Sequence, residues 1–205
     1  LFWLALLLFT PPYAILALAC APLPRMLRYR VISGWSRMML WWLRVLCGVR
    51  WRVEGREHLP ATPSVILAKH QSAWETFALP TLMPHPLAYV FKRELLYVPF
   101  FGWAMGRLDM IHIDRSKRVE AWARIAARGK ELFAQGIWVI MFPEGTRTER
   151  GHKGRYQSGA SRLAITCGVP IVPIAATSAK CWPRKSFLLR PGVIDVSIGR
   201  PIPSV

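Results

Sequence analysis

The feature that most constrains the fold is an alternation of short apolar runs and helical stretches that begins at Val49. By length and β-branched content, the apolar runs are typical of strands. They are VRWRVEG (49–55), SVILA (64–68), LAYVF (87–91), MIHI (110–113), IWVIMF (137–142), PIVPIAA (170–176) and VIDVSI (193–198). Helices are expected between them at 73–83, 98–108, 117–135 and 157–167. Such alternation predicts an α/β fold with a mostly parallel central sheet flanked by helices.

Residues 1 to 24 contain no charged side chain, and the first ionised group is Arg25. As a helix, this stretch is about long enough to cross the hydrocarbon core of a bilayer. Pro11 and Pro12 lie in its middle, so the helix either kinks there or restarts. A signal peptide is the alternative, but no basic region precedes the apolar one, and Ala19-Cys20-Ala21 matches a cleavage site only loosely. The composition favours a membrane anchor.

The next stretch, VISGWSRMMLWWLRVLCGV (31–49), is apolar apart from Arg37 and Arg44, which share one helical face. Tryptophans beside arginines are typical of the headgroup layer, so the stretch is predicted to be an interfacial helix. A core helix of the following domain is the alternative. From Arg25 to Arg56, arginines outnumber the one carboxylate, Glu54. This bias places the face after the first segment in the cytoplasm.

These patterns divide the chain near Gly48. Residues 1–48 are expected to form a membrane-associated helical hairpin, and residues 49–205 a second unit that carries the sheet. The sequence starts at Leu1 and stops at GRPIPSV, so we expect it to be trimmed at both ends, including the C-terminus of the second unit.

The chain combines a formal charge of +17 with 53% hydrophobic residues. Nucleic-acid binders are basic but seldom this apolar, whereas Lys and Arg near anionic headgroups gain about 1 kcal/mol each. The cysteines show no C-x-x-C spacing, which favours buried free thiols and a reducing cytoplasmic setting. A non-catalytic basic protein that binds membranes or nucleic acid stays as an alternative, and its binding should fall steeply with salt.

The segment KHQSAWETF (69–77) places His70 after a strand and Glu75 five residues later. On one continuous helix the two side chains would lie on different faces. They can meet only if His70 precedes the helix and Glu75 lies in its first turn. Ser72-Ala73-Trp74-Glu75 matches a capping box, with Ser72 as N-cap. The pair is therefore either a catalytic imidazole–carboxylate couple or a histidine beside a structural cap, and the two interpretations are compatible.

A second segment, IWVIMFPEGTRTERGHKGR, is a buried-type strand that ends at Pro143 and leads into basic residues. Ligands of α/β sheets bind at the carboxyl ends of strands, and arginine forks suit phosphate oxygens. A solvated basic loop is the alternative, which suits Arg150 to Arg155 better than Arg147.

No G-x-S-x-G elbow, Walker loop, H-E-x-x-H or dinucleotide fingerprint occurs in the sequence. Without a placed serine or cysteine nucleophile, an imidazole–carboxylate pair is expected to activate a hydroxyl of the substrate. Metal ligation by His70, His85 or His112 is a minor alternative, and we expect no metal site.

Together these segments resemble the glycerolipid acyltransferase family, and within it the bacterial members that acylate lysophosphatidic acid. The H-x4-D/E block is matched by His70 and Glu75, and the F-P-E-G-T-R block by Phe142 to Arg147. The family's other blocks resemble KRELLYVPFFGW from Lys92, DMIHIDR ending at Arg115, and VPIVPI (169–174). Many relatives have aspartate at the position of Glu75, so this chain departs there in side-chain length but not in charge.

The resemblance implies that residues 49–205 form an acyltransferase domain in which His70 is the general base and Glu75 its orienting partner. Lys92, Arg115 and Arg147 would hold the phosphate of the acceptor. Glu144, Gly145 and Thr146 would position the loop or the glycerol. Val169, Pro170 and Ile171 would line the apolar side near the acyl chain.

The implied reaction moves a fatty acyl chain from a thioester to the sn-2 hydroxyl of 1-acylglycerol-3-phosphate, giving phosphatidic acid in phospholipid biosynthesis. No cofactor is implied, since acyl-CoA or acyl carrier protein serves as the donor substrate. The expected partners are a membrane lipid and the acyl thioester, with no nucleic acid. The expected location is the bacterial inner membrane, with the active site on the cytoplasmic side. Glycerol-3-phosphate or another lysolipid is the alternative acceptor.

Overall fold

A computed structural model describes residues 1–114, 116–152 and 154–204. Its centre is a seven-stranded sheet with the strand order β1-β7-β6-β2-β5-β3-β4. The strands are β1 (Val49–Glu54), β2 (Val65–Ala68), β3 (Leu87–Lys92), β4 (Ile111–Ile113), β5 (Trp138–Met141), β6 (Ile171–Ala176) and β7 (Gly192–Ile198). β7 lies antiparallel to β6, and the other neighbours pair in parallel. The predicted α/β class with a mostly parallel sheet is confirmed, and each predicted strand is present.

The helices are α1 (Phe2–Ala19), α2 (Arg25–Cys47), α3 (Trp74–Leu82), α4 (Phe101–Met105), α5 (Arg118–Ala134) and α6 (Gly159–Cys167), with short 3₁₀ turns η1 (Arg56–His58), η2 (Arg93–Tyr97) and η3 (Ser178–Lys180). The helix expected at 98–108 is shorter than predicted. Val98 precedes Pro99 and has an extended backbone, because the proline ring disfavours the helical region for the residue before it. The helical turns therefore divide into η2 and α4.

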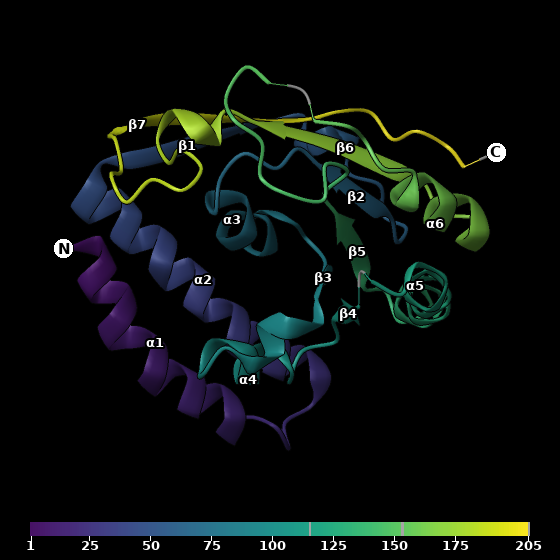
Figure 1. Ribbon diagram of the computed structural model, residues 1–205, viewed down its shortest axis with the longest axis horizontal. Coiled ribbons are helices and arrows are strands. Elements are labelled where there is room, and N and C mark those ends of the chain that lie inside the picture. Colours follow the sequence, from purple (N-terminus) through teal and green to yellow (C-terminus); the bar gives the residue numbers. More distant parts are fainter. Residues whose placement is uncertain (115, 153, 205) are drawn as a thin grey trace.

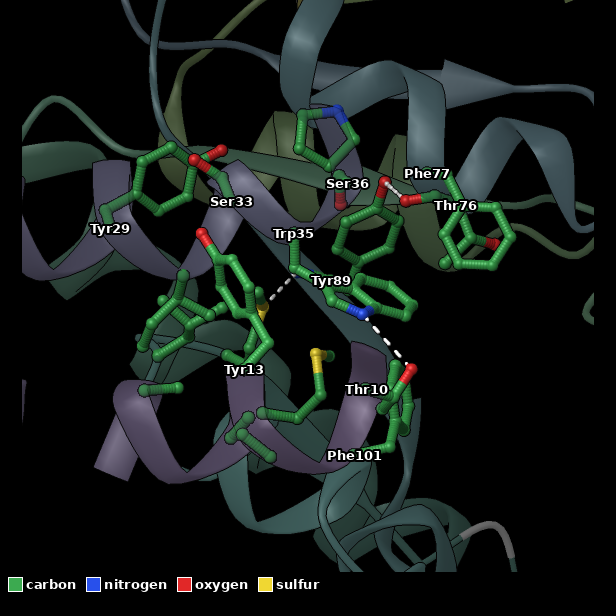
Figure 2. Close-up of a pocket in the computed structure, with 18 of the residues that line it drawn as sticks. Thr10, Tyr13, Tyr29, Ser33, Trp35, Ser36, Thr76, Phe77, Tyr89 and Phe101 are labelled. Atoms are coloured by element: carbon green, nitrogen blue, oxygen red, sulfur yellow. Dashed lines mark hydrogen bonds between the residues drawn. The ribbon is translucent and has the colours of Figure 1, made fainter. Parts of the chain in front are cut away.

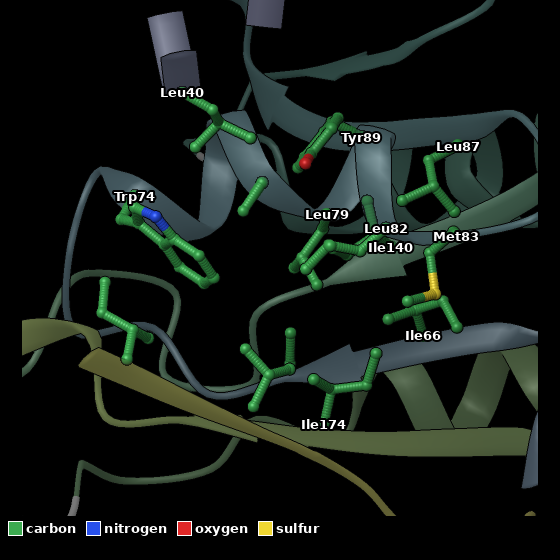
Figure 3. Packing of buried hydrophobic residues seen from close by; sticks show 14 of the residues in the cluster. Leu40, Ile66, Trp74, Leu79, Leu82, Met83, Leu87, Tyr89, Ile140 and Ile174 are labelled. Atoms are coloured by element: carbon green, nitrogen blue, oxygen red, sulfur yellow. The ribbon is translucent and has the colours of Figure 1, made fainter. Parts of the chain in front are cut away.

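Two hydrophobic cores cover the two faces of the sheet (Figure 1). Neighbouring residues of one strand alternate between them, as Val65 packs with α5 and α6 while Ile66 packs with α2 and α3. Figure 3 shows the core that contains Ile66, where Trp74 and Leu79 of α3 lie over Ile66 and Ile140 of the sheet. Burial on both faces explains why the central strands β2, β3 and β5 are almost continuously apolar.

Helices α1 and α2 pack against each other and precede the sheet, as expected for a helical hairpin (Figure 1). α1 extends through both Pro11 and Pro12. One face of α2 belongs to the same core as Ile66, where Leu40 and Leu43 are buried. Its other face exposes Trp41, with Arg37 and Arg44 also exposed. The core interpretation therefore holds for one side of α2, and the interfacial role of its exposed side stays a prediction.

Candidate active site

Three loops meet at one edge of the sheet, and two of them carry predicted site residues, namely His70 and Glu144 to Arg147. His70 follows β2, the segment from Phe142 to Thr148 follows β5, and Ser178 follows β6. These strands are parallel neighbours, so their carboxyl ends lie at the same edge. This is the edge at which α/β sheets bind ligands.

The carboxylate of Glu75 is the centre of this site. It is almost fully buried, with 1% of the residue exposed. His70 Nδ1 lies 3.3 Å from Oε2, which also accepts a hydrogen bond from the Ser72 N–H at 2.9 Å. Oε1 accepts one from the Gln71 N–H at 3.2 Å and another from the hydroxyl of Ser178. Each carboxylate oxygen thus has two partners, which fixes the orientation of the Glu75 side chain.

The predicted capping box is formed only in part. The Glu75 carboxylate accepts a hydrogen bond from the Ser72 N–H as expected. The hydroxyl of Ser72, however, accepts from the Trp74 N–H at 3.1 Å and not from the backbone N–H of Glu75. The helix begins at Trp74 with Ala73 as its N-cap. Because His70 precedes α3 and Glu75 lies in its first turn, the pair can meet, and the carboxylate serves both the histidine and the loop backbone.

The imidazole of His70 is held on two sides. Its ring stacks on Phe142, with centroids 3.9 Å apart and planes at 18°. With Glu75 as acceptor, Nδ1 carries the proton, and Nε2 is left with the lone pair that a base requires. A neutral imidazole in this tautomer can take a proton from a hydroxyl and leave its new positive charge beside a carboxylate.

Glu144 binds the loop of His70 to the loop after β5. Its side chain is fully buried and forms an ion pair with Lys69, at 3.0 Å from Nζ to Oε1. Its other oxygen, Oε2, accepts from the His70 N–H at 3.3 Å. On the far side of the same peptide, the His70 carbonyl accepts from the Thr148 N–H at 2.8 Å and from its hydroxyl at 3.2 Å. The backbone of His70 is thus fixed by the FPEGTR segment.

The remaining residues of that segment are more open to solvent. Gly145 has a φ of +65°, in the left-handed region that favours glycine, and is half-buried. Thr146 and Arg147 are exposed, and Arg147 directly precedes the threonine that binds the His70 carbonyl. Lys92 ends β3 at the same sheet edge and is also exposed. Arg115, predicted to bind phosphate, and Lys153 of the basic loop lie outside the described residues.

The predicted acyl-lining residues are not brought together with His70. β6 runs parallel to β2, with Val65 opposite Ile171 and Ala68 opposite Ile174. Val169 and Pro170 precede this register, so these two residues and Ile171 lie at the amino edge of the sheet, whereas His70 follows the carboxyl end of β2. The linear motif matched the family, but the strand direction carries its first residues away from the site.

Sequence reasoning missed Ser178 and Lys69 as partners of the two site carboxylates. Ser178 is fully buried and donates to Glu75 from the turn after β6. The signal was the polar pair Thr177-Ser178 at the end of an apolar strand, in the same position relative to its strand as His70. Lys69 was adjacent to the motif but carried no spacing signal of its own.

An apolar cavity of about 80 Å³ lies between α1, α2, α3, α4 and β3 (Figure 2). Aromatic rings form much of its wall, among them Tyr13, Trp35 and Phe77. Tyr89 connects the cavity to the site, because it lines the wall and its ring lies 6.3 Å from that of Phe142. The Tyr89 hydroxyl donates to the Thr76 carbonyl at 3.1 Å, next to Glu75. Burial raises the pKa of Tyr89 well above its ordinary value, which keeps this donor protonated.

The other histidines considered as metal ligands have different surroundings. His85 stacks on Trp138, with centroids 5.0 Å apart, and His112 Nε2 accepts from Arg124 at 2.6 Å. Burial and the nearby Arg124 lower the pKa of His112. In the part of the chain that the structure describes, no group of three His, Cys, Asp or Glu side chains could hold a metal ion.

Comparison with known proteins agrees with this geometry. A family model described as Acyltransferase matches residues 50–177. A 1-acyl-sn-glycerol-3-phosphate acyltransferase of Pseudomonas aeruginosa is 47% identical over 86% of this chain and 69% of its own. The human 1-acyl-sn-glycerol-3-phosphate acyltransferase alpha is 32% identical over 82% of this chain, which spans 60% of the human protein.

Among solved structures, the 1-acyl-sn-glycerophosphate acyltransferase PlsC of Thermotoga maritima is similar, with a TM-score of 0.78 over 99% of this chain and 83% of that one. Its identity is 22%, so it supports the fold alone. The family match includes both the histidine–glutamate couple and the FPEGTR loop that holds it. The chain therefore belongs to the acyltransferase family.

Proposed function

We propose that this protein transfers a fatty acyl chain from a thioester to the sn-2 hydroxyl of 1-acylglycerol-3-phosphate, giving phosphatidic acid. The observation that carries the proposal is the imidazole of His70 on the buried carboxylate of Glu75 at an open sheet edge. The names of the relatives, at up to 47% identity, support the acceptor. The apolar cavity beside the site suits an acyl substrate.

In the proposed reaction, His70 Nε2 takes the proton of the sn-2 hydroxyl as its oxygen attacks the thioester carbonyl. Glu75 stabilises the imidazolium that forms. The carbon–sulfur bond then breaks, and the imidazolium returns the proton to the leaving thiolate. The products are phosphatidic acid and a free thiol, so no acyl-enzyme and no cofactor is required.

The test of this proposal is an acyl-transfer assay with the purified protein in detergent. Each donor, acyl-CoA or acyl carrier protein thioester, is combined with lysophosphatidic acid, glycerol-3-phosphate and a neutral lysolipid. We expect phosphatidic acid from lysophosphatidic acid with at least one donor. Faster transfer to glycerol-3-phosphate or to the neutral lysolipid would contradict the acceptor assignment, and the donor arms identify the thioester.

Arg147 is proposed to hold the acceptor phosphate, together with Lys92 and Arg115. It is exposed beside Thr148, which binds the His70 carbonyl, so its backbone is positioned by the site itself. A guanidinium forks onto two phosphate oxygens, whereas lysine offers a point charge. Arg147→Lys should therefore lower kcat/KM for lysophosphatidic acid by roughly ten- to a hundredfold, since charge-assisted hydrogen bonds contribute about 1.5–3 kcal/mol.

The matched control for this substitution is Arg150→Lys in the same loop. Arg150 is also exposed but lies beyond the contact of Thr148 with His70. We expect KM for the acyl donor to be unchanged in both variants, and KM for lysophosphatidic acid to rise only in Arg147→Lys. Equal behaviour of the two variants in steady-state kinetics would remove the phosphate role and leave a solvated basic loop.

The cavity of Figure 2 is proposed to hold an acyl chain in place of the predicted Val169–Ile171 lining. Ala104 of α4 lines it and is only half-buried, so a larger side chain can be placed there without strain in the core. Ala104→Leu should move the preference toward acyl chains shorter by a few carbons while leaving the best rate within about threefold, because the added atoms fill space without touching His70.

Competition between acyl thioesters of different length measures this preference. Ala127→Leu is the control, since Ala127 is exposed on α5, on the other side of the sheet. An unchanged chain-length profile in Ala104→Leu would exclude the cavity as the site of the acyl chain.

Residues 1–48 are proposed to associate with the inner membrane, with the active site on the cytoplasmic side. α1 is long and apolar enough to cross a bilayer. Its outward residues are exposed, namely Leu4, Leu7, Leu8, Ile15 and Leu16. The acceptor is a lipid, so an apolar helix beside the cavity brings the catalytic domain to its substrate.

A further inference from the structure

We propose that a turn of the catalytic domain, residues 183–190, is a second membrane-binding element. It would insert Phe187 and Leu188 into a leaflet containing anionic lipid. The turn lies between β6 and β7, so it is distant from the helical hairpin in sequence. This inference rests on the proposed membrane association of α1, and it extends the membrane-binding surface onto the domain that carries His70.

The tip of this turn is apolar and open. Phe187 is 79% exposed and Leu188 77%, and these two large side chains are adjacent in the sequence. The chain on either side of the tip is anchored, since Trp182 is buried and Leu189 packs against the core. Single exposed apolar residues are common on soluble proteins, but an adjacent exposed pair on an ordered turn indicates a binding surface.

The turn is closed by its own hydrogen bonds. The Arg190 N–H donates to the Cys181 carbonyl at 2.8 Å and closes its base. At the tip, the Ser186 hydroxyl donates to the Leu188 carbonyl at 3.0 Å and accepts from the Leu188 N–H at 3.1 Å. These bonds satisfy backbone groups at the point that would enter the leaflet, where an unpaired group would be costly.

The turn is continuous with the apolar surface of α1. The Trp3 indole N–H donates to the Phe187 carbonyl at 2.8 Å, and the two rings pack at 5.5 Å. Trp3 also contacts Trp182 at 5.6 Å. In Figure 1 the yellow-green segment between β6 and β7 accordingly lies beside the N-terminal end of α1. Any leaflet that covers the exposed leucines at this end of α1 therefore reaches Phe187.

Charge commits the surface to an anionic leaflet. Arg184, Lys185 and Arg190 flank the tip, and no acidic residue occurs between Glu149 and Asp195. Basic residues around an apolar tip suit the headgroup layer, with the apolar side chains below it. The turn follows Ser178, which holds Glu75, so its insertion would keep the catalytic edge of the sheet at the bilayer surface.

Depth-dependent quenching of a fluorescent label tests this proposal. The label is attached to Leu188→Cys in full-length protein carrying Cys47→Ala and Cys167→Ala, because Cys20 and Cys181 are buried. The same background without the added cysteine measures residual labelling. Ile165→Cys on α6 is the matched control, since Ile165 is also exposed but lies on the opposite face of the sheet. Vesicles contain phosphatidylcholine and phosphatidylglycerol, with and without nitroxide-labelled lipid.

Iodide quenching at position 188 should fall at least about threefold when vesicles bind, because interfacial side chains lie below the headgroups. Nitroxide lipid should quench position 188 and leave position 165 unchanged. If the protein floats with the vesicles while iodide quenches both positions equally, the turn stays in water and this inference fails, though α1 still binds. If the protein does not float, the proposed membrane association fails, and the inference with it. Shielding by an acidic carrier protein in place of vesicles would assign the tip to a protein partner and also overturn the inference.

Discussion

Replacing His70 by alanine is expected to lower kcat by about 10²- to 10⁴-fold, the usual contribution of a positioned general base. The variant removes the imidazole between Phe142 and Glu75 but keeps the backbone bonds of residue 70 to Glu144 and Thr148. The loop should therefore stay in place, and the melting temperature should change by a few degrees at most. Single-turnover rates with saturating lysophosphatidic acid measure the chemical step.

The control for this variant is His152→Ala, in the basic loop. The side chain of His152 is exposed, and the contact of this residue with Lys69 uses its backbone carbonyl, which the substitution retains. Its activity should match that of the unmodified protein. Near-normal turnover in His70→Ala would remove the histidine from the chemistry and leave Glu75 as a structural carboxylate.

Glu75→Gln is expected to lower kcat by about 10²-fold or more, because an amide cannot stabilise an imidazolium as a carboxylate does. The structure also predicts a stability cost. Both oxygens of Glu75 accept hydrogen bonds, and on each side one donor is a backbone N–H. A glutamine amide group must face either the Gln71 or the Ser72 N–H, which leaves that buried donor unpaired at a cost of about 1–3 kcal/mol.

Ser178→Ala separates these two effects. It removes one donor to Glu75 but keeps the charge and the contact with His70. We expect kcat to fall by less than about tenfold. The loss of stability should be comparable to that of Glu75→Gln, since one hydrogen bond to a charged group contributes about 1.5–3 kcal/mol. Thermal unfolding and kcat are measured together for both variants. If Glu75→Gln loses stability but keeps its rate, the carboxylate is a cap for the loop and not a catalytic partner.

The fold could be predicted from the sequence to a large extent. The strands are separate short runs rich in apolar residues. The central strands β2, β3 and β5 are buried on both faces, whereas β1 and β7 alternate, and both patterns are typical of strands. The helix after Lys92 was less predictable, because Pro99 imposes an extended residue inside an otherwise helical pattern. The short helix α4 that results forms one side of the cavity.

The residue types of the site could be read from the sequence. His70 directly follows a strand, Glu75 lies in the first turn of the next helix, and the arginine-bearing FPEGTR loop follows another strand. Such motifs are local, so spacing is enough to find them. Which side chains meet depends on the tertiary structure. Ser178 reaches Glu75 and Lys69 reaches Glu144 from distant positions in the chain, whereas Val169 and Pro170 lie at the opposite edge. Strand order and direction set these distances, because the carboxyl ends of parallel neighbours lie at one edge of the sheet and their amino ends at the other.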